Sequence, residues 1–166
     1  EASVTTIEHV LSALTGMGVD NAVIDIDNVE VPILDGSAKP YIDAIWADGF
    51  ESQDAPRRYI ERKETVEIRN EEKGSVVRIE PADDFTYDIK IDFNSRVLGV
   101  QHATWDESTV YAEEIGTCRT FVFFHELEFL FSNGLVKGGD VDNAIVIVEH
   151  PVTKDQIQRM SDLFKV

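Results

Sequence analysis

Cysteine is almost absent from this sequence, since Cys118 is the only one among 166 residues. A single cysteine excludes an intramolecular disulfide, which fits a protein of a reducing compartment. Long apolar runs are also lacking. None approaches the roughly 18 residues that cross a bilayer, and no signal peptide is recognisable. The sequence therefore gives no indication of a secreted or membrane-spanning protein.

Basic residues are scarce relative to acidic ones, 15 against 32, which gives a formal net charge of −17. Such a charge repels phosphate backbones and anionic lipid head groups, so we expect no general nucleic-acid binding. A locally basic pocket for one small anionic ligand stays open. Hydrophobic residues make up 43% and charged residues 28% of the chain, a balance typical of a folded core. The length suits one large domain or two small ones.

A helix is predicted over residues 5–17, because apolar residues recur there at spacings of three and four. The apolar stripe consists of Ile7, Val10, Leu11 and Leu14. Thr5 and Glu8 match the T-x-x-E capping box, so Thr5 is the expected N-cap. Two strands are expected next, over 23–27 and 29–33, where apolar and polar residues alternate.

A polar stretch, 50–59, contains Pro56 and marks a predicted domain boundary. After it, the sequence pattern changes from helical to strand-like. A short helix capped by Ser37 precedes this stretch and ends before Gly49. Beyond the boundary the expected elements are three strands in meander order (59–69, 75–82 and 85–94), a helix (124–133), a buried strand (143–148) and a last helix (153–164).

The adjacent residues Glu8 and His9 are the first candidates for chemistry. Neighbouring side chains diverge by about 100° around a helix, so one of the two could bind a metal while the other holds its water. His9 lies about 200° from Ile7, away from the apolar stripe. A catalytic zinc typically takes three protein ligands, and Ala13 stands one turn beyond His9. The pattern alone favours Glu8 as a cap and His9 as a solvated residue, with a metal site as the alternative.

Two features of the second half each allow two interpretations. The run Lys137-Gly138-Gly139 is typical of a flexible turn, but its glycines also let a backbone approach a ligand. Phenylalanine is unusually dense just before this run, at positions 121, 123, 124, 129 and 131. Most of these rings are expected in the core, although so much apolar area also suits a groove for an acyl chain. His125 and His150 are interpreted as surface or capping groups.

Three stretches, 6–45, 91–95 and 118–148, together resemble the UDP-3-O-acyl-N-acetylglucosamine deacetylases of Gram-negative bacteria. The resemblance is carried by the E-H-V helix, the D-G-S-A turn, the sequence R-T-F and the lead-in G-G-x-x-D-N-A, in this order. Members of this family are zinc amidases of lipid A synthesis. The resemblance implies an α+β protein of two-layer α/β sandwich domains, with the active site between the layers where two similar domains meet.

Roles for individual residues follow from their matching positions. His9 would be a Zn2+ ligand, Glu8 the general base, and Thr120 a hydroxyl donor to the oxyanion. Phe93 would contact the uracil of the nucleotide. The remaining substrate-binding candidates would line an acyl-chain passage and are Phe121, Phe123, Leu127, Val136, Gly139 and Ala144.

The resemblance also implies a domain organisation. Residues 1–50 would be the C-terminal part of domain I, 51–58 a linker, and 59–166 an incomplete domain II with the acyl-passage insert at about 118–148. The H-x-x-x-D helix that supplies the family's other zinc ligands has no counterpart here, and the first strands before "EASV" are missing. We therefore expect a fragment of a longer protein, inactive by itself, with a catalytically silent α/β binding module as the alternative.

The expected partner of the parent protein is a UDP-linked acylated glucosamine substrate, and its expected location is the cytoplasm, with transient membrane proximity at most. Some members of the family carry a fused acyl-carrier-protein dehydratase domain downstream, so the parent could carry one as well.

Overall fold

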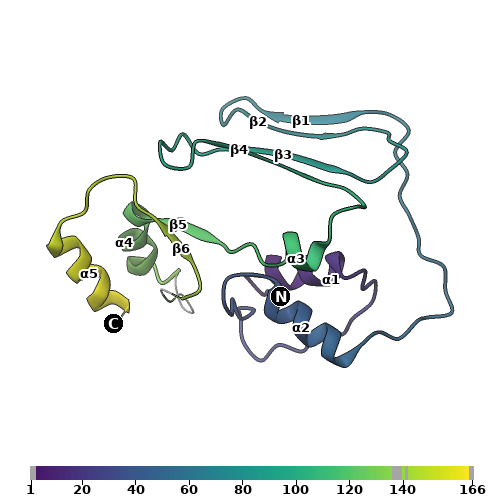
Figure 1. The fold of residues 1–166 in the computed structure, drawn as a ribbon, viewed down its shortest axis with the longest axis horizontal. Coiled ribbons are helices and arrows are strands. Elements are labelled where there is room, and N and C mark those ends of the chain that lie inside the picture. Colours follow the sequence, from purple (N-terminus) through teal and green to yellow (C-terminus); the bar gives the residue numbers. More distant parts are fainter. Residues whose placement is uncertain (1–2, 136–139, 141, 165–166) are drawn as a thin grey trace.

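The structure, a computed structural model, describes residues 3–135, 140 and 142–164. It is a mixed α+β fold, which confirms the expected class (Figure 1). In chain order the elements are α1 (Glu8–Gly16), α2 (Lys39–Asp48), β1 (Val66–Asn70), β2 (Ser75–Ile79), β3 (Tyr87–Asp92), β4 (Val100–Trp105), α3 (Tyr111–Glu114), β5 (Phe121–Phe123), α4 (Phe124–Ser132), β6 (Ile145–Ile147) and α5 (Lys154–Phe164).

Helices α1, α2 and α3 share a small core, although α3 is far from the other two in sequence (Figure 1). Its buried members are Ala13, Ala38, Ile42 and Ala112, with Ile42 fully buried. Tyr111 connects α3 to α1, because its hydroxyl lies 2.6 Å from Ser12 Oγ and its ring packs against Gly16. The core therefore holds the start of the chain against residues about a hundred positions later.

The predicted capping box of α1 is wrong. The helix begins at Glu8 with Ile7 as N-cap, and no side chain caps it. Thr5 instead forms an isolated parallel bridge with Glu30, and its N–H donates to the carbonyl of Val29 at 2.9 Å. This pairing takes Thr5 away from the helix end. The buried side of α1 is also rotated from the predicted stripe, because Val10 and Ala13 are buried while Ile7 and Leu11 are 44% and 45% exposed.

The two strands predicted over 23–33 do not form, apart from the bridge at Glu30. Val23 is 90% exposed and Val29 57% exposed, so most of this alternating pattern is not buried, although Val31 is only 3% exposed. Strand backbones need a partner for their N–H and C=O groups, and among the described residues the only β-bridge of this segment is with Thr5. The second helix does form, with Ala38 as N-cap. The predicted cap Ser37 lies one residue earlier, where its Oγ accepts a hydrogen bond from the Lys39 N–H at 3.1 Å.

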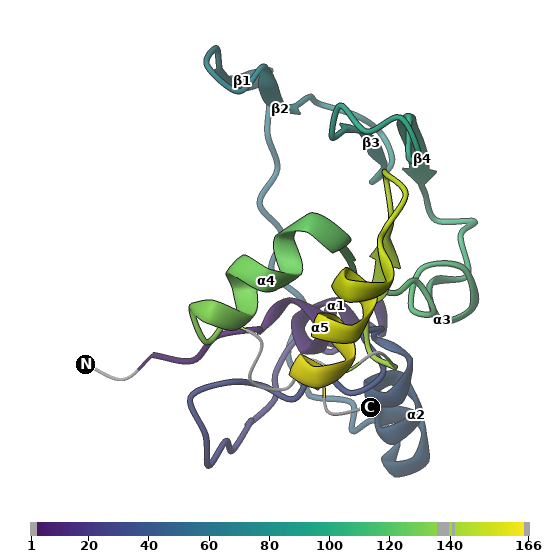
Figure 2. The same cartoon turned by 90° about the vertical axis from the view of Figure 1, so that its left-hand side faces the viewer.

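The middle of the chain forms two separate antiparallel hairpins, β1–β2 and β3–β4, so the predicted three-stranded meander is wrong. In the first, Ile68 lies opposite Val77, and in the second, Tyr87 lies opposite Trp105. Strand β4 was not expected from the sequence. Both views place the hairpins on one side of the helices (Figure 1 and Figure 2). The predicted linker 51–58 contains no helix or strand, and the proposed domain boundaries remain a prediction.

The last part of the chain is a β5–α4–β6 unit followed by α5. Strands β5 and β6 are parallel, with Phe121 opposite Ile145, and α4 lies between them in the chain. The helix predicted over 124–133 and the strand predicted within 143–148 are therefore confirmed. Phe131 of α4 meets Phe164 of α5 edge to face, with ring centroids 4.7 Å apart. Helix α5 therefore packs on the outer side of the unit (Figure 2).

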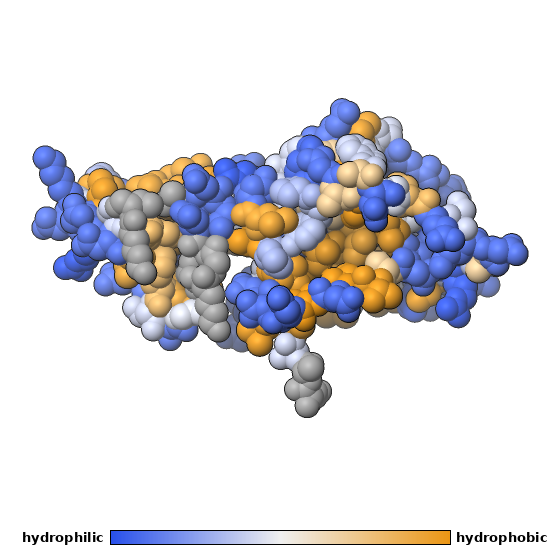
Figure 3. Space-filling model, turned by 90° about the horizontal axis from the view of Figure 1, so that it is seen from below, coloured by the Kyte–Doolittle hydropathy of each residue, from blue (hydrophilic) through white to orange (hydrophobic). Residues whose placement is uncertain are grey.

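Many apolar side chains reach the surface, for example Trp46 (53% exposed) and Phe50 (58% exposed). Figure 3 shows a broad area of such residues in the right half of the view from below. Within the part of the chain that the structure describes, no helix is long and apolar enough to cross a membrane.

Candidate functional site

Glu8 and His9 lie in the first turn of α1, which packs on α2 through Ala13 and Ile42. Glu8 is exposed and His9 is half-buried. Among the described residues neither side chain has a hydrogen-bond or ion-pair partner, and Glu8 does not cap its helix. The capping interpretation of Glu8 is therefore not supported, and its carboxylate is available for another role.

A metal site needs several donors at one place. The described residues include no group of three or more histidine, cysteine, aspartate or glutamate side chains that could hold a metal ion. His9 offers one imidazole, whereas catalytic zinc takes three protein ligands. These residues therefore do not complete a zinc site by themselves.

Thr120 lies at the junction of three segments. Its N–H donates to the carbonyl of Gly36 at 2.8 Å, and its own carbonyl accepts from the N–H of Ile145 at 3.0 Å. Gly36 has φ +81°, and a Cβ built there would stand 1.9 Å from the carbonyl oxygen of Asn143 and 3.4 Å from the Thr120 methyl group. The D-G-S-A turn and the lead-in to β6 thus approach so closely at Gly36 that no side chain fits between them.

Arg119 adds a second connection beside the first. Its Nε donates to the carbonyl of Asp35 at 2.9 Å, and its guanidinium also donates to the carbonyl of Asp142. The Asp35 carboxylate in turn accepts hydrogen bonds from Ser37 Oγ at 2.7 Å and Ser37 N–H at 3.0 Å. Partial burial alone would raise the pKa of Asp35, but the Ser37 hydrogen bonds and the Arg119 charge together hold that pKa below its ordinary value of 3.8.

The lowered pKa of Asp35 predicts a pH effect on stability. A carboxyl group whose pKa is lower in the folded than in the unfolded state stabilises the fold fully above its unfolded pKa. This stabilisation is lost as pH falls from 3.8 through the lower folded-state pKa. The free energy of unfolding of Asp35→Asn should therefore lie below that of the natural sequence at neutral pH, and the difference should shrink in acid. A difference that stays constant from pH 6 to pH 2 in urea titrations would contradict this origin.

Three of the predicted substrate-binding residues lie together. Phe93, just after β3, meets Phe121 and Phe123 of β5 edge to face, with ring centroids 5.3 and 6.0 Å apart. Phe121 and Phe123 are themselves 5.6 Å apart. The resemblance to the family implied separate roles for these rings, one at the nucleotide and two at the acyl chain, whereas the structure brings them together in one aromatic cluster.

The other lining candidates have different surroundings. Leu127 is buried at 3% exposure, and Ala144 is half-buried just before β6. Val136 and Gly139 lie outside the described residues. Leu127 and Phe123 thus belong to the core of the β5–α4–β6 unit. The prediction that most of the five phenylalanines are core residues is wrong, because only Phe123 is buried and Phe129 is 65% exposed.

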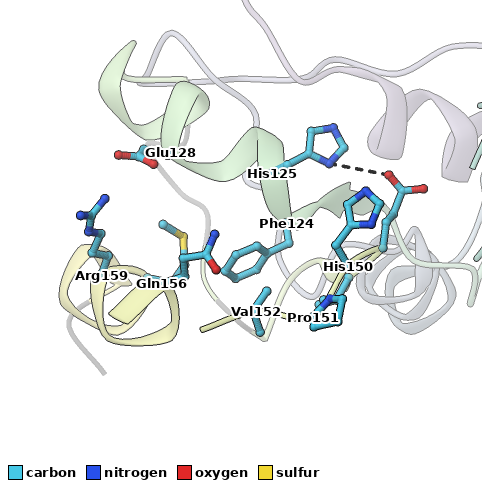
Figure 4. A pocket seen from close by; sticks show the side chains of 11 residues that line it. Phe124, His125, Glu128, His150, Pro151, Val152, Gln156 and Arg159 are labelled. Atoms are coloured by element: carbon cyan, nitrogen blue, oxygen red, sulfur yellow. Dashed lines mark ion pairs between the residues drawn. The ribbon is translucent and has the colours of Figure 1, made fainter. Parts of the chain in front are cut away.

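A separate cavity of about 270 Å³ lies between α4, residues 148–152 and α5 (Figure 4). His125 Nδ1 and the Glu149 carboxylate form an ion pair there at 3.7 Å, and His150 is also in the lining. None of the predicted site residues lines this cavity. It is therefore distinct from the Thr120 junction and the aromatic cluster.

Comparisons with known proteins bear on the whole chain. The family model described as UDP-3-O-acyl N-acetylglycosamine deacetylase, LpxC, matches residues 1–164. The chain belongs to this deacetylase family. It is 44% identical to the UDP-3-O-acyl-N-acetylglucosamine deacetylase of Helicobacter hepaticus, over 99% of this chain and 54% of that protein. It is 43% identical to the bifunctional enzyme LpxC/FabZ of Porphyromonas gingivalis, over 100% of this chain and 36% of that protein.

Membership of the LpxC family confirms the resemblance inferred from the sequence. The relatives are longer, and the chain spans about a third to half of their length. Sequence reasoning found Thr120 through the R-T-F motif but missed the contributions of Asp35, Arg119 and Asn143. The signal was present, because these residues stand in the same D-G-S-A, R-T-F and D-N-A motifs that carry the resemblance.

Proposed function

We propose that the full-length LpxC-family protein is a zinc-dependent deacetylase. It removes the N-acetyl group of UDP-3-O-(3-hydroxyacyl)-N-acetylglucosamine and releases acetate, the committed step of lipid A biosynthesis, in the cytoplasm. The single observation that carries the proposal is the family match along residues 1–164. The roles of Glu8, His9 and Thr120 are part of the proposal and rest on the motifs in which these residues stand. Relatives that span the same residues are named as enzymes of this activity.

The chain's own residues have distinct roles in the proposed reaction. Glu8 accepts the proton of the attacking water, which an exposed carboxylate without a structural partner can do. The Thr120 hydroxyl donates a hydrogen bond to the oxygen that becomes negative when the acetamide carbonyl is attacked. In support of this role, the described residues leave that hydroxyl without a hydrogen-bond partner, while the Thr120 backbone is bonded on both sides.

Zinc would supply Lewis-acid chemistry in the full-length protein. His9 fits one ligand position, because it is a half-buried imidazole beside a free carboxylate. The described residues lack the further donors, as noted above, so we propose that they come from the part of the protein that the chain does not span. By itself, the 166-residue chain should not turn over substrate.

Substrate binding is proposed at the aromatic cluster. Phe93 is 51% exposed, so part of its ring is available to stack on a uracil base, while the ring meets Phe121 and Phe123 edge to face. The β5–α4–β6 unit would then receive the acyl chain, with Leu127 and Ala144 behind the rings. The proposed partner is therefore a UDP-linked acylated glucosamine.

A fused dehydratase domain is a further possibility for the full-length protein. Relatives from Porphyromonas gingivalis, Chlorobaculum tepidum and Bacteroides thetaiotaomicron are named as bifunctional LpxC/FabZ enzymes. The alternative function is a catalytically silent binding module, and the observation that favours it is the incomplete set of metal donors in the described residues.

Acetate release tests the proposed function directly. The full-length protein, assayed with the UDP-linked acylated N-acetylglucosamine, should release acetate, lose this activity after exhaustive chelation and regain it when Zn2+ is added back. Metal analysis should find about one zinc per active chain, and less in a His9→Gln variant. Turnover that survives complete removal of metal would contradict the zinc dependence, and no acetate release from metal-loaded protein would favour the silent module.

A further inference from the structure

Two consecutive residues, Arg119 and Thr120, are bound to the same two distant segments. Thr120 is bonded through its backbone to Gly36 and Ile145. Arg119 is bonded through its side chain to the carbonyls of Asp35 and Asp142. Arg119 and Thr120 thus each contact the D-G-S-A turn on one side and the start of β6, or the residues just before it, on the other.

The chemistry of the arginine side chain suits this arrangement. A guanidinium presents several N–H donors in a rigid, planar fork, so it can bind two carbonyl oxygens at fixed directions at once. The two acceptors are 84 and 23 residues away from Arg119 in sequence. Both are backbone carbonyls, so the contacts depend on the path of the chain and not on the side chains of Asp35 and Asp142.

The hydrogen-bonded backbone of Thr120 limits the directions that its side chain can take. Threonine is branched at Cβ and has few χ1 rotamers. The Thr120 methyl group faces Gly36, at 3.4 Å from the position of a Cβ there. With the methyl group against the turn, the hydroxyl must point elsewhere, and none of the described residues accepts or donates a hydrogen bond to it. A shift of the turn would therefore move the hydroxyl.

We propose that Arg119 is a positioning residue, which fixes the Thr120 hydroxyl for oxyanion stabilisation by holding the Asp35 and Asp142 carbonyls in one guanidinium fork. This inference rests on the proposed function, because it gives Arg119 its effect through Thr120. Arg119 itself does not touch the reacting atoms. Its removal should affect the chemical step and leave substrate binding nearly unchanged.

A double-mutant cycle in the full-length protein tests this inference. Thr120→Val removes the donor and should lower kcat by about a hundred- to a thousandfold. Arg119→Gln should lower kcat by about ten- to a hundredfold, since a displacement on the order of 1 Å can cost a hundredfold in rate, with KM changed less than about threefold. In the Thr120→Val background the same arginine substitution should have almost no further effect, because the group that it positions is gone.

Two further variants complete the design. Arg119→Lys keeps the charge but cannot span both carbonyls, so its kcat should fall between those of the natural protein and Arg119→Gln. Arg78→Gln is the matched control, because Arg78 is exposed and makes an ion pair only with Glu80 among the described residues. It should leave kcat unchanged. Thermal unfolding of each variant would separate a kinetic effect from a loss of folded protein.

Each other outcome has its own meaning. Additive effects of the two substitutions, or a raised KM at unchanged kcat, would overturn the role of Arg119 while the deacetylase function stands. Failure of both Arg119 variants to fold would also overturn it, because the residue would then serve stability alone. If Thr120→Val keeps full kcat, Thr120 has no oxyanion role for Arg119 to support. A natural protein that releases no acetate would instead remove the proposed function.

Discussion

Replacing Glu8 by glutamine in the full-length protein should lower kcat for acetate release by about a hundred- to ten-thousandfold, the usual contribution of a general base. Glutamine keeps the size of the side chain but cannot accept the proton. Because Glu8 neither caps α1 nor has a hydrogen-bond partner among the described residues, the fold should hardly respond. The lost attraction between the carboxylate and the helix N-terminus amounts to at most about 1 kcal/mol.

Bound zinc should stay at the same stoichiometry in Glu8→Gln, which separates a missing base from a missing metal. The matched control is Asp155→Asn, which removes an exposed carboxylate from the first turn of α5. This control should share any small change in stability and keep full turnover. Unchanged kcat in Glu8→Gln would mean that Glu8 is an ordinary helix residue and would support the silent-module alternative.

Replacing Gly36 by alanine should lower the free energy of unfolding by about 2–5 kcal/mol, through two additive causes. The φ of +81° is a left-handed conformation that costs a residue with a Cβ about 1–2 kcal/mol. The Cβ would also stand 1.9 Å from the Asn143 carbonyl oxygen, and such overpacking typically costs about 1–3 kcal/mol more. The obstacle is backbone and not the end of a flexible side chain, so the turn and the lead-in to β6 must separate.

Gly134→Ala is the control for the backbone term, because Gly134 also has a positive φ, +66°, at the end of α4 but no atom within 4 Å of its Cβ position. Urea unfolding should therefore find a clearly smaller loss for Gly134→Ala than for Gly36→Ala. Equal losses would show that the close approach to Asn143 adds nothing to the cost of the Gly36→Ala substitution. In the full-length protein, Gly36→Ala should also reduce kcat, since Thr120 is bonded to Gly36.

The sequence predicted helices better than strands, for a physical reason. The periodicity of α2 and α4 depends on residues three and four apart, so it can be read locally. The alternation of Ile24 and Ile26 with aspartates is just as regular, but a strand also needs a partner. Among the described residues, the only β-bridge over 23–33 is the one between Glu30 and Thr5. Conversely, β4 was missed although it pairs along its whole length with β3.

The helix start at Glu8 shows the same limit. Thr5 and Glu8 have the spacing of a capping box, and local reasoning had no means to foresee that Thr5 pairs with Glu30 instead. That pairing joins residues 25 positions apart. It matters for function, because a capping Glu8 would have had a structural role that the observed Glu8 lacks.

The roles in the candidate site were predictable only through the motifs of the family. Thr120 and Phe93 were named from these motifs alone, whereas Phe121 also stands in the dense run of phenylalanines, which left core and acyl-chain groove as alternatives. The connection of Arg119 to Asp35 spans 84 residues, so no local pattern could predict it. The assigned roles of these residues remain predictions that the experiments above would test.

The two ends of the β5–α4–β6 unit meet where the Thr120 carbonyl bonds to Ile145 N–H at 3.0 Å. A segment whose two ends meet can change in length and composition without displacing what lies at its base. If this unit receives the acyl chain as proposed, the residues between Phe124 and Asp142 could be exchanged to suit longer or shorter hydrocarbon tails while the proposed hydrolytic step stays intact. Substrate range and turnover would then be separately adjustable properties of this enzyme family.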